Sequence, residues 1–262
     1  MNETAIPWTG RTWNPASGCV EISPGCKFCY AKTLAERYLG TSAFPNGFDL
    51  TIRPHKLREP HALKEPSLIF VNSMSDLFWE AIPDSYRDQV LDVIEATPRH
   101  QYQVLTKRPE NMLRYSRRRR LPSNFWAGTS IESCLYAARA DILRQVQAEV
   151  RFISAEPLLS PLVPALKLDG LHWVITGGES GLHLKDAALR GRRGLAELVD
   201  GRWVPRADRA HWITDLRDAC VAAGVKFFHK QWGGLRPTSA GRLVDGRTWD
   251  ELPREREVAR AA

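Results

Sequence analysis

The sequence predicts an α/β fold, a partial or complete (βα) barrel. Seven short apolar segments alternate with helical patterns along the chain, which is typical of parallel βαβ units. Polar residues follow these segments at their carboxyl ends, and in a (βα) barrel this is the edge at which active sites lie. The length of 262 residues is one that α/β barrels use for a single domain.

The expected elements follow one another in a regular order. The predicted strands are residues 11–14, 68–71, 102–105, 125–128, 150–153, 173–175 and 225–228, of which the first has the weakest pattern. Predicted helices cover residues 31–38, 85–96, 135–146 and 211–223, where apolar side chains recur at helical spacing. Asp84 or Ser85, after Pro83, is an expected start of the second helix, and Gly224 is an expected stop of the last.

Six of the predicted strands end in side chains that can do chemistry. The segments that follow them are residues 72–76, 106–108, 129–132, 154–157, 176–180 and 229–234. Glu156, Glu179 and Lys230 stand out, and Gln231 beside the lysine is expected to face the same pocket. The two acids also have a purely structural interpretation as partners of basic residues at neighbouring strand ends, because a buried carboxylate without a partner is costly.

The chain is expected to divide into a barrel and a tail. Residues 1–235 form the barrel, with an exposed insertion near residues 182–206 that is rich in glycine and arginine. A small hairpin is expected around Asp200 and Gly201. Residues 236–262 are rich in glycine, proline and charged side chains, and we expect them to be loosely packed or disordered.

Three of the five cysteines lie close together, at Cys19, Cys26 and Cys29. Thiolates are soft ligands that select zinc, copper(I) or iron–sulfur clusters. Three of them without a fourth nearby cysteine leave one coordination position open, which favours a cluster with one free iron. The alternative is a zinc site completed by His55 or His61. An odd, clustered set of cysteines argues against a disulfide framework and predicts a reducing, cytoplasmic compartment.

The formal charge of +7 is concentrated in one stretch. Residues 99–120 hold eight lysines and arginines against the single acid Glu110, so this stretch alone nets +7. The expected contacts to a nucleic acid are Arg108, Arg117, Arg118, Arg119 and Arg120. The alternative is a solvated arginine-rich loop. No apolar run approaches the roughly 20 residues of a membrane span, and the first residues do not read as a secretory signal.

Six blocks of the sequence resemble, in the same order, a phage-associated bacterial family of three-cysteine proteins of unknown function that is radical-SAM-like. The blocks are residues 12–30, 71–78, 103–109, 154–159, 177–181 and 230–233. The resemblance implies a barrel of the radical SAM type, with a [4Fe–4S] cluster on Cys19, Cys26 and Cys29 and S-adenosylmethionine on its free iron. Reduction of this cofactor yields a 5′-deoxyadenosyl radical that abstracts hydrogen from a substrate.

The resemblance also assigns residues around the cofactor. Phe28 matches an aromatic residue that packs near the adenine in radical SAM enzymes. The Gly-Gly-Glu that binds the methionyl amine is replaced by residues 73–76, which assigns this role to Ser73 or Asp76. The other expected cofactor contacts are Lys107, Ser130 and Glu179. Ser130 is also typical of a helix N-cap. The cysteine spacing, C-x6-C-x2-C, departs from the usual C-x3-C-x2-C of that superfamily.

A more distant resemblance is to the spore photoproduct lyases, DNA-repair radical SAM enzymes in which a cysteine and a tyrosine return a hydrogen atom to the substrate. Cys134 and Tyr136 follow the fourth predicted strand and are the matching candidates. The alternative for these two residues is a helix that faces the core. With Glu156 and Lys230 they make up the expected catalytic set.

These observations predict a radical SAM enzyme that repairs or modifies a nucleic acid base, in DNA rather than RNA. A base reaches a barrel mouth only when it is extruded or single-stranded. The resemblance implies an electron donor such as flavodoxin or ferredoxin. Two alternatives stay open: a radical SAM enzyme with a small-molecule or protein substrate, and a zinc-stabilised nucleic-acid-binding protein without catalysis.

Overall fold

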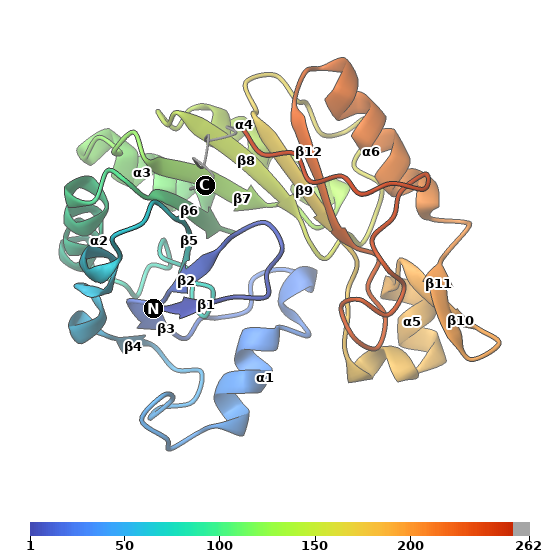
Figure 1. The fold of residues 1–262 in the computed structure, drawn as a ribbon, viewed down its shortest axis with the longest axis horizontal. Helices are drawn as coiled ribbons and strands as arrows, with labels where there is room; N and C mark the ends of the chain where they lie inside the picture. The colour runs from blue at the N-terminus through green and yellow to red at the C-terminus, as the bar shows by residue number, and fades with distance from the viewer. Residues whose placement is uncertain (254–262) are drawn as a thin grey trace, which may run out of the picture.

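The computed structural model describes residues 1–253, which are built around a curled sheet of eight strands (Figure 1). The strand order is β1-β2-β5-β6-β7-β8-β9-β12, in which β1 pairs antiparallel at one edge and the other strands are parallel. The bounds are β1 Asn2–Glu3, β2 Arg11–Trp13, β5 Leu68–Val71, β6 Gln101–Thr106, β7 Phe125–Ser130, β8 Val150–Ala155, β9 Trp173–Gly177 and β12 Lys226–Gln231. All seven predicted strands are therefore confirmed. Within residues 1–253 β12 does not pair with β2, so the sheet is a partial (βα) barrel.

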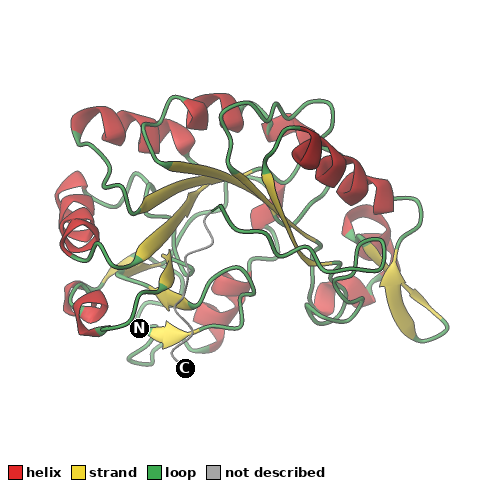
Figure 2. Cartoon of the chain, turned by 45° about the horizontal axis from the view of Figure 1, so that its top comes forward, coloured by secondary structure: helices red, strands yellow, loops and turns green. Residues whose placement is uncertain are grey.

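The helices cover the convex face of the sheet (Figure 2). They are α2 Asp84–Ala96, α3 Pro109–Arg118, α4 Arg139–Arg144 and α6 Ala210–Ala222, while α1 Tyr30–Arg37 lies at the open side of the curl (Figure 1). Single 3-10 turns occupy Pro24–Cys26, Pro54–Lys56, Glu59–Ala62, Cys134–Tyr136 and Leu182–Lys185. The helix predicted over 135–146 is α-helical only in α4, and α3 was not predicted. Gly224 follows α6 with a φ of 67°, which confirms the expected stop.

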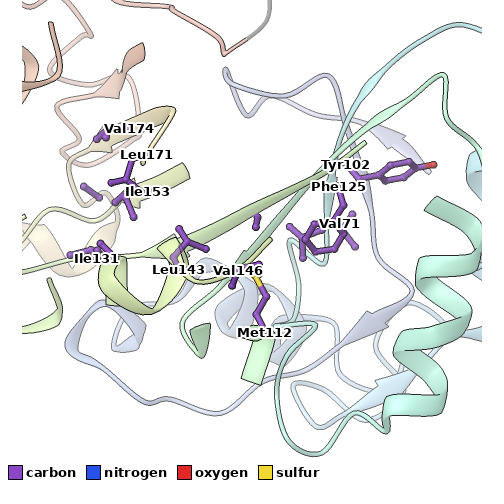
Figure 3. Close-up of a cluster of buried hydrophobic side chains, with 14 of the residues drawn as sticks. Val71, Tyr102, Met112, Phe125, Ile131, Leu143, Val146, Ile153, Leu171 and Val174 are labelled. Carbon is purple, nitrogen blue, oxygen red and sulfur yellow. The ribbon is translucent and has the colours of Figure 1, made fainter. Parts of the chain in front are cut away.

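Two apolar layers lie on opposite faces of the sheet because alternate side chains of a strand point to opposite sides. The larger layer packs between the sheet and the helices, where Val71, Tyr102 and Val174 from the strands meet Met112 and Leu143 from α3 and α4 (Figure 3). The smaller layer lines the concave face and is rich in aromatic rings. The strands are buried on both faces, as expected for a parallel sheet.

The segment expected as an insertion forms α5 (Ala187–Arg193) and a hairpin of β10 (Ala196–Val199) and β11 (Arg202–Pro205). Asp200 and Gly201 make the hairpin turn with φ values of 48° and 77°, as a two-residue turn requires. A further short pair joins β3 (Ala16–Ser17) to β4 (Thr51–Ile52). Among the helices of residues 1–253, none combines the length and apolar character that crossing a bilayer requires.

The described part of the expected tail differs from a loosely packed segment. Val244 and Trp249 are buried in the larger apolar layer, and Asp250 forms a bridge with Phe228 of β12. The segment is packed because it runs beside the last strand, β12, and its apolar side chains cover the outer side of that strand (Figure 1). The remainder of the tail, residues 254–262, lies outside the described residues.

Candidate active site at the carboxyl edge of the sheet

The concave face of the half-barrel carries aromatic rings at one end and small side chains at the other. Its floor is made of Trp8, Phe70, Trp126, Phe152, Trp173 and Phe228. Further along the same face, toward the carboxyl ends of β7, β8 and β9, stand Ser130, Ser154 and Gly177. The small side chains therefore lie at the carboxyl edge, or mouth, where (βα) barrels bind their substrates, and the large rings lie at the other end of the face.

An ion pair crosses this mouth. The Nζ of Lys230, on the concave face of β12, donates to the carboxylate of Glu156, which follows β8. The two side chains are 18% and 19% exposed, so each charge is compensated by the other as it is desolvated. Two of the expected catalytic residues therefore meet. Gln231 does not join them, because it is the next residue of the strand and its amide donates to the carbonyl of Gly178 on the other face.

The cysteine loop, residues 14–29, begins where β2 ends and crosses the mouth. Its start is fixed by Asn14, whose Oδ1 accepts hydrogen bonds from the Met74 amide at 3.0 Å and the Ser73 hydroxyl at 3.2 Å. The Ser75 hydroxyl donates to the carbonyl of Gly18 at 2.7 Å. Further along, the amide of Gly25 donates to Glu132 Oε1 at 3.3 Å, after β7. The loop thus joins the ends of strands that are far apart in sequence.

The three thiols of this loop are free and half-buried. Arg108 Nη1 donates to Cys19 Sγ at 3.9 Å, and Cys26 lies close enough to contribute to the raised pKa of Cys19. Burial, reinforced by the charge of Asp76, raises the pKa of the Cys19 thiol to about 11. This thiol is therefore protonated in the metal-free chain, and a metal would bind it by displacing the proton.

Asp76 is held entirely by protein groups. Its Oδ1 accepts hydrogen bonds from the Thr106 hydroxyl at 2.7 Å and the Phe78 amide at 2.9 Å. Its Oδ2 accepts from the Lys107 amide at 3.1 Å and Arg108 Nη1 at 3.0 Å. The carboxylate expected to bind a methionyl amine thus lies in a buried ion pair with Arg108 and orients the loop after β6.

Arg108 and Ser73 also have protein partners. Arg108, expected to contact a nucleic acid, is 6% exposed and lies buried between Asp76 and Cys19. Its Nη2 is buried without a hydrogen-bond partner among the described residues. The Ser73 hydroxyl bonds with Asn14, and its carbonyl accepts from the Tyr30 hydroxyl at 2.6 Å. Lys107 keeps a half-exposed side chain at the mouth.

Glu179 and Phe28 meet the insertion. Both oxygens of Glu179 accept hydrogen bonds from Arg193 of α5 at 2.6 Å. The ring of Phe28 stacks on His183 with a centroid separation of 3.8 Å and an interplanar angle of 1°. One face of the aromatic ring expected to pack against adenine is therefore covered by protein. Arg193 and His183 were missed in the sequence, because they are two of many charged residues in a segment without a motif.

Cys134 lies at the same edge as the cysteine loop. It is exposed, starts the 3-10 turn after β7, and follows Glu132, the residue that bonds to the loop. Tyr136 is half-buried, packs against the larger apolar layer and carries Arg139 at 4.3 Å over its ring. Arg139 in turn donates to the fully buried Glu132 at 3.1 Å. The two candidates for hydrogen return therefore lie in different environments.

The arginine run 117–120 is not part of this edge. Helix α3 starts after the carboxyl end of β6 and runs back along the sheet, so the run lies near the amino ends of the strands. Arg118 donates to Asp88 of α2 at 2.5 Å, and Arg119 pairs with Asp92 at 2.8 Å. The expected solvated loop is instead the last turn of a helix and its exit, partly neutralised by the acids of α2. A nucleic acid held there would lie far from the thiols.

The thiols are not arranged around a single ion. Within residues 1–253 there is no group of three or more histidine, cysteine, aspartate or glutamate side chains placed to hold one metal ion. This argues against a preformed zinc site completed by His55 or His61. A cubane cluster is wider than an ion, and its three thiolates stand farther apart. The donor set of three thiols on one half-buried loop fits such a cluster.

A family model described as "Protein of unknown function (DUF5131)" matches residues 3–198 and 201–253. The chain belongs to this family. No protein with curated annotation matches it. A solved structure of a spore photoproduct lyase mutant is similar with a TM-score of 0.55 and 14% identity, over 87% of this chain and 78% of that chain. A second, spore photoproduct lyase complexed with dinucleoside spore photoproduct, has a TM-score of 0.49 and 14% identity, over 86% and 75%.

The first of these similarities confirms the predicted fold class. The DUF5131 chain has the partial (βα) barrel of the radical SAM type that spore photoproduct lyase has. At 14% identity the similarity concerns the fold alone. One barrel type serves many chemistries, so the fold does not identify the reaction, and the side chains of the site carry that information.

Proposed function

We propose that this chain is a radical SAM enzyme, in which Cys19, Cys26 and Cys29 hold a [4Fe–4S] cluster that binds S-adenosylmethionine. The observation that carries the proposal is the position of three free thiols on one loop across the mouth of a half-barrel of this type. When bound, the cluster and S-adenosylmethionine supply hydrogen abstraction by reductive cleavage of the cofactor. The electron comes from a flavodoxin or ferredoxin, in the reducing cytoplasm.

The residues of the chain orient this centre. Arg108, fixed by Asp76, donates to the sulfur of Cys19. The hydroxyls of Ser130 and Ser154 lie on the concave face with no hydrogen-bond partner among residues 1–253, so they are free to bind a ligand. The ion pair of Glu156 and Lys230 forms one wall of the mouth, where it binds polar substrate groups.

We infer that the substrate is a nucleic acid base in DNA. Lys27 on the cysteine loop and Lys185 and Arg192 on the insertion are exposed. Among the described residues none of the three forms a hydrogen-bonded ion pair with an acid, although the charge of Arg192 helps to lower the pKa of Asp186. These cations, rather than Arg117 to Arg120, are placed to bind phosphates while an extruded base enters the mouth. Cys134, exposed at the same edge, is the candidate for returning a hydrogen atom to the substrate.

Metal analysis tests the cluster. Protein purified without oxygen is expected to hold about four irons and four sulfides per chain. Cys26→Ala loses this iron, whereas Cys134→Ser, which changes a cysteine outside the loop, keeps it. Reduced protein given S-adenosylmethionine then releases 5′-deoxyadenosine. One equivalent of zinc without sulfide would instead identify the non-catalytic binding protein.

A salt titration tests the substrate. Binding of single-stranded DNA to Arg192→Gln is expected to have a salt slope smaller by about 1 than the wild type. The matched control is Arg117→Gln, which removes an equally exposed charge at the opposite edge of the sheet. Equal salt slopes for all three proteins would contradict the assignment of phosphate contacts to Arg192. A smaller slope in Arg117→Gln alone would instead assign the phosphate contacts to the arginine run 117–120.

A further inference from the structure

Two side chains of the insertion, Arg193 and His183, contact the cysteine loop, and Arg193 makes the hydrogen bonds. Arg193, the last residue of α5, donates from Nε and Nη2 to the two oxygens of Glu179, each at 2.6 Å. Its Nη2 also donates to the carbonyl of Pro24 at 3.0 Å, across 169 residues of sequence. Three segments therefore meet at one guanidinium: the insertion, the segment after β9 and the turn that contains Cys26.

The apolar contacts of this guanidinium lead to the next cysteine. The Cζ of Arg193 lies 5.1 Å from the centroid of the Phe28 ring, a cation–π contact. The opposite partner of that ring is His183, which also comes from the insertion. Phe28 lies between Cys26 and Cys29, so the insertion contacts the loop on both sides of Cys26 and directly before Cys29.

The loop has little else to fix it at this point. The 3-10 turn Pro24–Cys26 has no buried residue and no side-chain cap. Val20 and Ile22, before the turn, are 45% and 39% exposed, so the loop has no apolar core of its own. Its other anchors nearby are the bond from Gly25 to Glu132 and, directly after Cys29, the bond from the Tyr30 hydroxyl to the Ser73 carbonyl. A bidentate, charge-assisted pair is the strongest hydrogen-bonded contact available to such a segment.

We propose that Arg193 is a positioning residue that holds residues 23–29, and with them the thiols of Cys26 and Cys29, against the mouth of the half-barrel. The insertion is then a part of the thiol site. The consequence for a cluster rests on the proposed function. The positioning itself is a property of the metal-free chain and is measurable without iron.

Hydrogen exchange on the metal-free full chain tests the proposal. In Arg193→Met we expect residues 20–29 to exchange about tenfold faster or more, because loss of one charge-assisted hydrogen bond shifts a local opening equilibrium by that factor. The matched control is Arg192→Met, one residue earlier in α5, whose exposed side chain acts on Asp186 but has no contact with the cysteine loop among the described residues. Maleimide labelling of Cys26 and Cys29 is expected to accelerate in parallel, and Arg193→Lys, which keeps the charge, to recover part of the protection.

A second variant separates positioning from general loss of stability. Arg193→Met leaves the buried carboxylate of Glu179 without its guanidinium partner, beside the His183 ring at 3.3 Å, and this alone can loosen the chain. Arg193→Met combined with Glu179→Gln removes that charge, and faster exchange confined to residues 20–29 in this double variant supports the proposal. Exchange and labelling equal to those of Arg192→Met overturn it. Wild-type protein without iron would refute the proposed function but leave this comparison intact.

Discussion

Asp76→Asn distinguishes a structural role of Asp76 from a role in cofactor binding. The native carboxylate accepts four hydrogen bonds, two at each oxygen. In the variant an amide NH2 replaces one oxygen, and in either orientation it faces donors. The amide is neutral in both orientations, so the guanidinium of Arg108 also loses its buried counter-charge.

The magnitude follows from the burial of the pair. Asp76 and Arg108 have side chains 8% and 7% exposed, and breaking a buried ion pair from one side costs about 3–5 kcal/mol. For a chain of this size that corresponds to a fall in Tm of roughly 6–20 °C. Glu80, the other acid beside Arg108, is 65% exposed, so Glu80→Gln is the matched control and costs less than about 1 kcal/mol.

Thermal and urea unfolding of the metal-free proteins give the answer. The reasoning is refuted if Asp76→Asn unfolds within about 1 kcal/mol of Glu80→Gln. If the same variant kept the stability of Glu80→Gln but, reconstituted with iron, had lost affinity for S-adenosylmethionine, Asp76 would be the amine ligand that the family resemblance implies. Loss of stability in the metal-free chain supports the structural role instead.

Three further perturbations have expected outcomes in unfolding experiments. Burial, with a smaller effect from Arg242, lowers the pKa of His229 to about 3, so stability is complete above pH 6.5 and is lost as the pH falls toward 3. The loss is at most about 1.4 kcal/mol per pH unit, and His229→Gln flattens this slope; an unchanged slope would argue against the buried neutral ring. Gly128→Ala brings a Cβ within 2.3 Å of the ring of Phe152 and lowers the free energy of unfolding by about 1–3 kcal/mol. An unchanged Tm would mean that the Phe152 ring moves aside without cost. Arg119→Ala lowers the free energy of unfolding by about 1 kcal/mol because its ion pairs with α2 are lost, whereas replacement of the exposed Arg117 by alanine changes it by less than about 0.5 kcal/mol. Equal effects of the two substitutions would show that the α2–α3 contact does not contribute to stability.

The strands were predictable because of where they lie. A parallel strand is buried on both faces, so it appears in the sequence as a short unbroken apolar run such as residues 68–71 or 150–153. The polar segments that follow such runs share one edge for the same topological reason. The meeting of Glu156 with Lys230, 74 residues apart, is a consequence of that edge.

The partners of the charged residues were not predictable in this way. A count over residues 99–120 gives +7, yet the acids that pair with Arg118 and Arg119 stand on α2, two elements earlier in the chain. The direction of α3 decides the rest, because it takes the arginine run to the amino edge while Arg108 stays at the carboxyl edge. Local charge predicts neither neutralisation by a neighbouring helix nor the edge to which a helix carries its residues.

The long spacing between the first two cysteines has a physical explanation in these contacts. The residues between Cys19 and Cys26 include Pro24 and Gly25, whose carbonyl and amide bond to Arg193 and Glu132. One partner belongs to the insertion and the other follows β7. A three-residue connection that kept Pro24 and Gly25 would leave one residue between Cys19 and this anchored pair, in place of residues 20–23. The unusual spacing is therefore linked to the insertion. We expect that shortening the connection to C-x3-C would break the hydrogen bonds of Pro24 to Arg193 and of Gly25 to Glu132, so that Arg193 would no longer position the loop.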